Sequence, residues 1–171
     1  MGVSGVCTTV VALGDGWFSA DLSSETLTRT TLASARSGMK VNLEPSLRAG
    51  AEIGGHFVAG HVDGVGTVTL WRRDGGGVVA EFRAPPEVAA YVVGKGSVAV
   101  DGVSLTPHSV ECERFRVSLI PETLRATTLG ALAIGRRVNL ESDLIAKYVA
   151  KTGAQRAGVS LDLLARAGFL D

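Results

Sequence analysis

The chain has 171 residues, of which 46% are hydrophobic, enough for one ordinary domain or two small ones with a buried core. Basic and acidic residues both number 17, so no net charge attracts nucleic acid or an anionic membrane. The sequence shows no signal-peptide pattern or membrane-spanning run, and its two cysteines give neither a disulfide framework nor zinc-ligand spacing. We therefore expect a cytoplasmic globular protein with small neutral or apolar partners and no metal.

Near the N-terminus, residues 4–9 read SGVCTT, and residues 101–106 repeat the pattern as DGVSLT. Each stretch predicts a turn followed by a strand on which Cys7 or Ser104 shares one face with the threonine two positions later. An Asp-Gly turn with threonine in the next strand is also ordinary hairpin chemistry, and a cysteine is more often a small buried hydrophobe than a nucleophile. Repetition favours a functional role without deciding it.

Two short helices are predicted where the triplet ETL occurs, at residues 25–27 and 122–124. Ser24 is the expected N-cap of the first helix, and Pro121 occupies the first helical position of the second. A structural role as helix starts explains both segments without any function.

The stretch GGHFVAGHVDG at residues 54–64 contains His56 and His61. Residues five apart point to opposite faces of a strand and about 140° apart on a helix, so the two histidines do not form a chelating pair. Valines and glycines around them favour a strand over about 56–70, with the glycines at bulges or close backbone contacts. We expect His56 to support this strand.

The rest of the chain continues with short strands and turn signals. We predict a turn at RRDGGG, a strand at 78–84, a helix within 85–93 that ends near Gly94, strands before and after Asp101-Gly102 and near 114–120, a helix over 122–132 and a strand over 136–141. Short strands with few small helices favour an antiparallel barrel over parallel βαβ units. The fold class expected is therefore mainly all-β, with small Greek-key barrels.

The C-terminal segment has helical periodicity instead. Residues 142–150 carry Ser142 as a polar cap, followed by apolar positions that share one helix face, and residues 160–171 predict a second helix ending near Gly168. Helices appended to a barrel need a surface to bury against, so we expect this segment to contact another subunit.

An internal repeat organises these elements. Residues 5–44 align with residues 102–141 without a gap at a constant offset of 97, and a repeat of this length predicts one structural unit that occurs twice. Residues 53–97 have no counterpart before the first copy. We expect a partial N-terminal barrel in 1–50 that lacks its front strands, a complete barrel in 51–142 and the helical segment in 143–171.

Together these motifs resemble the riboflavin synthase family, whose chains carry two lumazine-binding barrels. The matching pieces follow the family's order over nearly the whole chain: SGVCTTV, SSETLTRTTL, VNLE, IGGHFVAGHVDG, KGSVAVDGVSLT, LIPETLRATTLG, VNLESDLIAKYV and SLDLLARAGFLD. The resemblance implies that two 6,7-dimethyl-8-ribityllumazine molecules exchange a four-carbon unit, giving riboflavin and 5-amino-6-ribitylaminouracil without a metal or redox cofactor. It also implies a homotrimer with active sites between the first barrel of one subunit and the second barrel of its neighbour.

The resemblance assigns catalytic roles to five residues. It implies that Ser104 and Thr106 position the substrate and its activating water with support from Asp101, that His61 assists proton transfer, and that Cys7 meets the reacting edge of the second substrate. The implied substrate-binding positions are Cys7, Thr8, Thr9, Asp21, Leu22, Ser23, Ser24, Glu25, Thr26, Gly60, His61, Val62, Lys95, Ser104, Leu105, Thr106, Ser118, Leu119, Ile120, Pro121, Glu122 and Thr123.

The sequence departs from the family pattern in the first copy. Family members begin with a Met-Phe-Thr-Gly-like strand to which nothing here corresponds, and Ser4 replaces the usual asparagine. In the second copy, Pro107 removes a strand donor. Two alternatives follow: a non-catalytic lumazine- or flavin-binding protein, or an inactive shortened synthase. The joint presence of His61, Lys95, Ser104 and Thr106 favours the enzyme, whereas the missing front of the first barrel favours the binding protein.

Overall fold

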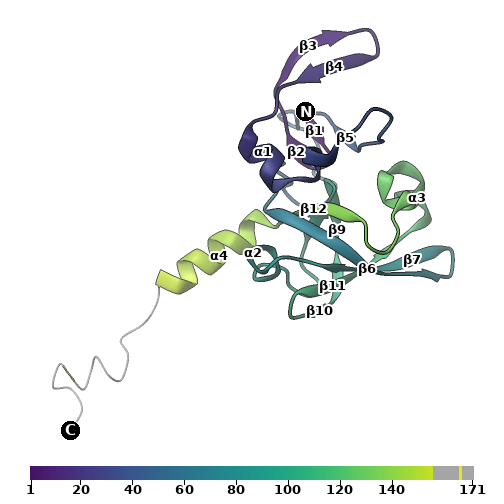
Figure 1. Cartoon of the computed structure of the whole chain (residues 1–171). Coiled ribbons are helices and arrows are strands. Elements are labelled where there is room, and N and C mark those ends of the chain that lie inside the picture. The colour runs from purple at the N-terminus through teal and green to yellow at the C-terminus, as the bar shows by residue number, and fades with distance from the viewer. Residues whose placement is uncertain (156–165, 167–171) are drawn as a thin grey trace.

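The computed structural model describes residues 1–155 and Arg166, and the chain is built mainly of short antiparallel strands (Figure 1). The first copy comprises β1 (Gly2–Val3), β2 (Val6–Cys7), β3 (Val10–Gly14), β4 (Trp17–Ala20), α1 (Ser24–Arg29), the 3-10 helix η1 (Thr31–Ser34) and β5 (Leu43–Glu44). From residue 64 the elements are β6 (Gly64–Asp74), β7 (Gly77–Arg83), α2 (Pro86–Ala89), β8 (Val98–Val100), β9 (Val103–Leu105), β10 (Pro107–Glu111), β11 (Arg114–Leu119), α3 (Pro121–Ala126), the 3-10 helix η2 (Thr128–Ala131), β12 (Arg137–Ser142) and α4 (Leu144–Gln155).

The strands of the described residues form three sheets. The largest is a curled seven-stranded sheet with the order β10-β11-β7-β6-β12-β8-β9, and the first copy contributes a three-stranded sheet β2-β1-β5 and the two-stranded hairpin β3-β4. Every pairing is antiparallel. The predicted all-β class and its antiparallel architecture are therefore confirmed.

The repeat seen in the sequence is also a repeat of strand register. Gly2 pairs with Cys7 between β1 and β2, and the residues at offset 97, Ala99 and Ser104, pair between β8 and β9. The hairpins β3-β4 and β10-β11 match pair for pair and carry the same irregularity near their open ends. One local sequence pattern thus produces one local geometry twice.

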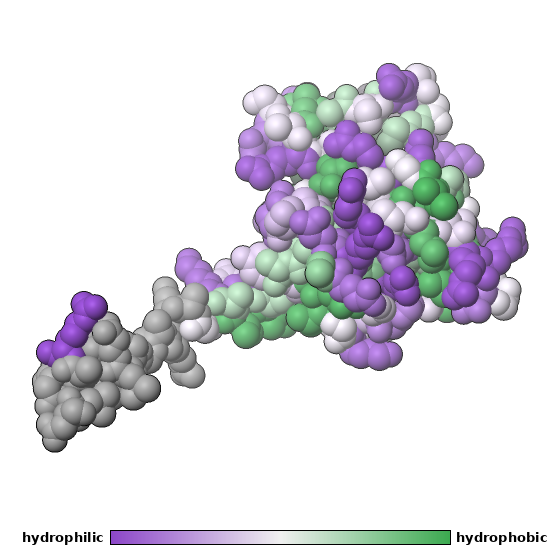
Figure 2. All heavy atoms as spheres, turned by 60° about the horizontal axis from the view of Figure 1, so that its bottom comes forward, coloured by the Kyte–Doolittle hydropathy of each residue, from purple (hydrophilic) through white to green (hydrophobic). Residues whose placement is uncertain are grey.

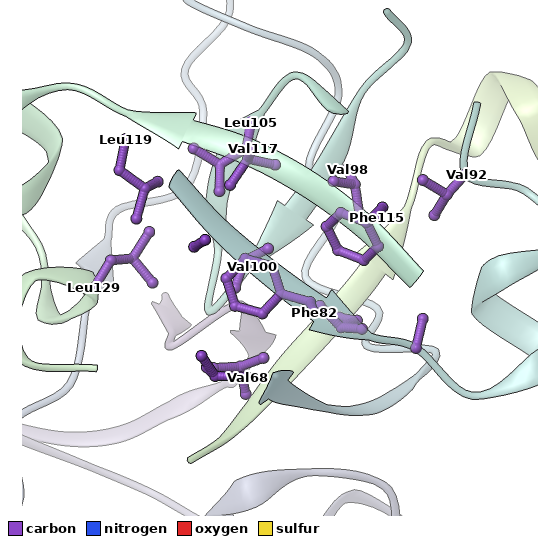
Figure 3. Packing of buried hydrophobic residues seen from close by; sticks show 14 of the residues in the cluster. Val68, Phe82, Val92, Val98, Val100, Leu105, Phe115, Val117, Leu119 and Leu129 are labelled. Atoms are coloured by element: carbon purple, nitrogen blue, oxygen red, sulfur yellow. The ribbon is translucent and has the colours of Figure 1, made fainter. Parts of the chain in front are cut away.

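The main hydrophobic core belongs to the seven-stranded sheet. Its side chains converge on the concave side of the sheet, where the rings of Phe82 and Phe115 stack with centroids 5.4 Å apart (Figure 3). Valines from five strands and Leu129 from η2 close the cluster. In the first copy, Val6 and Leu32 are the only buried hydrophobic residues. The sequence after residue 63 therefore supplies most of the core.

Two predicted elements differ in detail. The strand expected over 56–70 begins at Gly64, so the segment before it is a loop, and β6 extends to Asp74 with the turn at Gly75-Gly76. The helix predicted over 122–132 is two short helices, because the backbone of Thr127 is extended and its hydroxyl accepts from the Leu129 N–H to start η2. Strand partners and side-chain caps, rather than hydrophobic pattern, set these boundaries.

The C-terminal helix α4 leaves the body of the protein as an arm (Figure 1). Its N-terminal cap is Asp143, whose carboxylate accepts from the Ile145 N–H at 2.9 Å, and not Ser142 as predicted. Leu144, Ile145, Tyr148 and Val149 expose an apolar face, part of the hydrophobic surface along this arm (Figure 2). The second helix predicted in 160–171 lies outside the described residues, apart from Arg166.

Candidate functional site

Two equivalent hairpin turns meet where the copies contact each other. Ser4-Gly5 and Asp101-Gly102 both have positive φ angles at both residues, 44° and 77° in the first turn and 47° and 80° in the second. Consecutive positive φ values are the signature of a type I′ hairpin turn, which matches the twist of its strands. A Cβ atom on Gly5 would lie 2.6 Å from the Gly102 nitrogen, so the contact requires glycine on both sides.

Two asparagines, also related by the offset of 97, lock this contact reciprocally. Asn42 donates from its amide to the Asp101 carbonyl at 2.9 Å, and Asn139 donates to the Ser4 carbonyl at 2.8 Å. Each asparagine also accepts, through Oδ1, a backbone N–H at the start of the other copy's 3-10 helix, both at 2.7 Å. The two copies are therefore joined through a pseudo-two-fold arrangement of side chain to main chain.

Asp101 is buried beside this contact. Its Oδ1 accepts the Asn139 N–H at 2.8 Å, which fixes the turn against β12. Burial raises the pKa of the Asp101 carboxyl to about 6, and the hydrogen bond from Asn139 and the charge of Arg136 only partly oppose that rise. The carboxylate thus ties the turn that precedes Ser104 to the main chain of β12.

An open cavity of about 1210 Å³ lies next to the two turns. The turns, the loop 52–60, the segment 40–47 and residues after the N-terminal part of α3 line it. Four of the predicted site residues are among its lining: Cys7, Gly60, Asp101 and Ser104. Cys7 and Ser104 occupy the same position of the repeat, so the cavity is shared by two equivalent polar positions.

The loop 52–60 connects these two positions. At one end, Nδ1 of His56 lies 2.7 Å from the Ser104 hydroxyl oxygen. At the other end, the Gly60 carbonyl accepts the Cys7 N–H at 2.8 Å. The Glu141 carboxylate holds the loop in place by accepting the Ala59 and Gly60 N–H groups at 2.8 and 3.0 Å.

The histidines are therefore placed differently from the prediction. Neither lies on a strand, and the half-buried His56, expected only to support a strand, is the one bonded to Ser104. His61 is exposed and outside the lining of the cavity. Side-chain alternation could not place them, because the loop has no strand partner.

The other predicted site residues lie outside the lining of this cavity: Thr8, Thr9, Asp21, Leu22, Ser23, Ser24, Glu25, Thr26, Val62, Lys95, Leu105, Thr106, Ser118, Leu119, Ile120, Pro121, Glu122 and Thr123. Thr8 is buried and bonds the Met1 carbonyl at 3.0 Å. Lys95 is exposed at a positive φ of 64°, and its N–H donates to the Pro107 carbonyl. Thr106 and Ser118 are exposed, whereas Leu105 and Leu119 belong to the core.

The helix starts confirm one cap prediction and correct another. Ser23, not Ser24, caps α1 by accepting the Thr26 N–H at 3.1 Å. Pro121 stands at the start of α3 as predicted. Glu122 in the first turn of α3 forms an exposed ion pair with Arg125 at 2.6 Å, so its carboxylate has a local partner.

Within residues 1–155 and Arg166, no group of three or more His, Cys, Asp or Glu side chains is placed to hold a metal ion. Over the same part of the chain, no helix is long and apolar enough to cross a membrane.

Comparisons with known proteins match this architecture. The model of the lumazine binding domain family matches residues 1–46 and 59–143. A riboflavin synthase of Actinobacillus pleuropneumoniae is 39% identical over 98% of this chain and 80% of its own length, and one of Mycobacterium bovis is 49% identical over 86% and 75%. The solved structure of LumP complexed with riboflavin has a TM-score of 0.77 at 24% identity, covering 83% of this chain and 77% of LumP.

Proposed function

This chain belongs to the riboflavin synthase family of lumazine-binding proteins, and from that premise we propose how its two copies share one reaction. The function is that of a riboflavin synthase, a transferase. A four-carbon unit passes between two 6,7-dimethyl-8-ribityllumazine molecules, and the products are riboflavin and 5-amino-6-ribitylaminouracil. Two identical substrates need two related binding positions, which a repeated unit provides.

We place one substrate beside Cys7 and the other beside Ser104. The observation that supports this most directly is that these equivalent residues of the repeat line a common cavity. Its volume of about 1210 Å³ exceeds the roughly 300–1,000 Å³ usual for one small ligand. Each of the two positions therefore has space for one substituted pteridine, and its reaction partner binds in the facing half-site of a neighbouring subunit.

The chemistry needs positioning more than strong acids or bases. The 7-methyl group of the lumazine is acidic because its anion is delocalised into the ring, so a modest base near an oriented partner suffices. We assign the orientation of the substrate and its activating water to Ser104 and Thr106, and proton transfer across the subunit interface to His61. Thr106 and His61 are exposed outside the cavity of the single chain, so both act in this proposal at the contact with the neighbouring subunit. Asp101 acts through the turn, since its carboxylate holds the backbone that carries Ser104.

The active assembly in this proposal is a homotrimer in the cytoplasm, with the first copy of one subunit facing the second copy of its neighbour. The exposed apolar face of α4 supports a subunit contact, because such a face is stabilised by burial against another chain. The free cysteines, Cys7 and Cys112, are compatible with a reducing compartment.

The proposal is tested by incubating the purified chain with 6,7-dimethyl-8-ribityllumazine and following riboflavin formation. We expect turnover, and we expect Ser104→Ala and Cys7→Ala each to reduce it by at least about tenfold, a loss typical of a missing positioning group. Tight lumazine binding without any turnover would replace the enzyme with the second candidate, a lumazine- or flavin-binding protein.

Co-expression of Cys7→Ala with Ser104→Ala chains tests the intersubunit site. Neighbouring subunits then form some sites with both residues intact, and activity recovers relative to either variant alone. If the mixed assembly stays as inactive as its parents, both substrates bind within a single chain.

A further inference from the structure

We propose that His56 and Ser104 act as a hydrogen-bonded pair in the second half-site. In this pair His56 positions the Ser104 hydroxyl through Nδ1 and contacts the substrate through Nε2, an inference that rests on the function proposed for the cavity. The contact between Nδ1 and the hydroxyl oxygen is 2.7 Å long and joins residues far apart in the chain.

The approach of the loop to Ser104 is made possible by glycine. A Cβ atom on Gly55 would lie 2.6 Å from the Ser104 hydroxyl oxygen and 2.8 Å from its Cβ, closer than real Cβ atoms come. Without a side chain at this position, the loop can bring the next residue, His56, onto the hydroxyl. A serine hydroxyl otherwise rotates freely, so a fixed partner restricts its proton and its lone pairs to defined directions.

The second ring nitrogen of His56 is available to a ligand. Nε2 is buried and is the only buried side-chain nitrogen or oxygen atom in the described residues without a hydrogen-bond partner. Such an atom is unfavourable unless something pairs with it, and exceptions in native structures call for a functional explanation. His56, Gly54 and Gly55 all line the cavity, and the two glycines have no side chain that could cover the imidazole ring.

A ribityllumazine carries the complementary groups. In neutral imidazole one nitrogen donates and the other accepts, so Nε2 can form one hydrogen bond in either tautomer. The pteridine carbonyls accept, and the ribityl hydroxyls both donate and accept. A ligand oxygen therefore satisfies Nε2 while Nδ1 keeps its bond to Ser104.

The pair also makes the two half-sites chemically different. The equivalent residue Cys7 hydrogen-bonds to the same loop through its backbone N–H, which donates to the Gly60 carbonyl, and its side chain lies against Gly60 without a polar pair. In a transfer between two identical molecules, one must give the four-carbon unit and the other must receive it. The His56–Ser104 pair is present in the second half-site and has no equivalent at Cys7. This difference distinguishes the molecule that gives the four-carbon unit from the molecule that receives it.

Two conservative variants separate the two nitrogens. In His56→Asn the side-chain amide occupies the place of Nδ1 and nothing replaces Nε2, whereas in His56→Gln the amide reaches the place of Nε2. The exposed His108 lies outside the cavity, so His108→Asn is the matched control. For each variant we would measure the Kd for riboflavin by flavin fluorescence, together with kcat and KM for the lumazine.

We expect His56→Asn to weaken riboflavin binding about tenfold and to raise KM for the lumazine, the effect of one lost hydrogen bond, with a smaller loss of kcat than in His56→Gln. We expect His56→Gln to preserve the Kd and to lower kcat about tenfold, because the Ser104 hydroxyl is no longer oriented. Adding His56→Gln to Ser104→Ala should cause no further loss of kcat, since the two residues act as one unit.

The proposal is overturned if both variants behave like His108→Asn, or if Asn and Gln change Kd and kcat in the same way. A starting chain that neither binds riboflavin nor produces it refutes the proposed function and the inference together. A starting chain that does either of these, with His56 variants that change neither measured constant, refutes only the inference.

Discussion

The hairpin β3-β4 of the first copy and the hairpin β10-β11 of the second have matching registers but different surroundings. On its other edge β11 pairs with β7, and Phe115 is only 1% exposed. In the part of the chain that the structure describes, β4 pairs with β3 alone, and Leu13 is 78% exposed. The repeat therefore determines turn and strand geometry locally. Burial of the hairpin depends instead on β6 and β7, which precede the second copy and have no counterpart before the first.

The largest expected effect comes from the equivalent phenylalanines Phe18 and Phe115. Phe115→Ala removes a ring that stacks on Phe82 in the core and should cost about 3–5 kcal/mol of unfolding free energy. Phe18→Ala removes a half-buried ring and should cost about 1 kcal/mol, by the area that remains to be lost. Urea unfolding of both variants checks this, and equal losses would mean that the first copy has a core of its own.

The contact between the copies is tested next, through Gly102. Gly102→Ala would place a Cβ atom 2.7 Å from the Gly5 nitrogen at a φ of 80°, and we expect a loss of about 3 kcal/mol from overlap and strain together. Gly38→Ala is the control, because its φ is 82° but nothing lies within 4 Å, so only the backbone strain of about 1 kcal/mol applies. Matching losses in thermal unfolding would show that the two turns do not touch in solution.

The asparagine pair sharpens the comparison further, because its hydrogen bonds are the same in both copies but its exposure is not. Asn139 is 1% exposed, and Asn139→Ala leaves the Ser4 carbonyl and the Thr31 N–H unpaired, at a cost of about 2–3 kcal/mol. Asn42 is half-buried, so water can replace its bonds and Asn42→Ala should cost about 1 kcal/mol. The reverse order in chemical denaturation would contradict the assignment of burial to the second copy.

The remaining effect depends on pH and concerns the turn residue that differs between the copies, Ser4 against Asp101. Because the folded pKa of Asp101 is raised to about 6 from 3.8, the folded state binds more protons than the unfolded state between these values. This group therefore favours folding at low pH, and its contribution declines as pH rises from about 4 to 6, by up to about 3 kcal/mol.

The variant Asp101→Asn removes this titration and keeps an oxygen that can accept the Asn139 N–H. We expect its stability relative to the starting protein to increase from pH 4 to pH 6 and to level off above pH 6. Guanidinium unfolding at a series of pH values measures this difference, and a difference independent of pH would show that Asp101 is accessible to water.

The fold was predictable from the sequence wherever a local pattern sufficed. The offset of 97 correctly related every paired strand of the two copies, and the turn residues Gly5 and Gly102 were visible as such. The segment before Gly64 was predicted wrongly as a strand, because valines and glycines fit a strand pattern but the backbone makes only isolated bonds to neighbouring strands, at Gly60 and Asp63, and no ladder. The Glu141 carboxylate accepts two N–H groups of this segment instead, and the Asp63 carboxylate fixes its end by accepting the Ser142 N–H.

The site was predictable only in part for the same reason. Cys7 and Ser104 followed from the repeat, but the contact between His56 and Ser104 crosses 48 residues and depends on the path of a loop. The one local signal was the Gly54-Gly55 pair beside His56, since adjacent glycines often mark a close backbone approach. Periodicity gives no direction to a side chain in a loop, so the sequence could not predict which side chain His56 would meet.

The reciprocal asparagine contacts have a consequence for how the two copies diverge. Each copy offers the same patch to the other, as in an isologous dimer joined into a single polypeptide. The asparagine side chains bond the main chain of the other copy's turn, at Asp101 and Ser4, while each turn side chain accepts the backbone N–H of the asparagine in its own copy. That position therefore accommodates both serine and aspartate, because each keeps the positive φ and an accepting side-chain oxygen. The symmetry is thus recorded in the backbone, which leaves the side chains around Cys7 and Ser104 free to specialise.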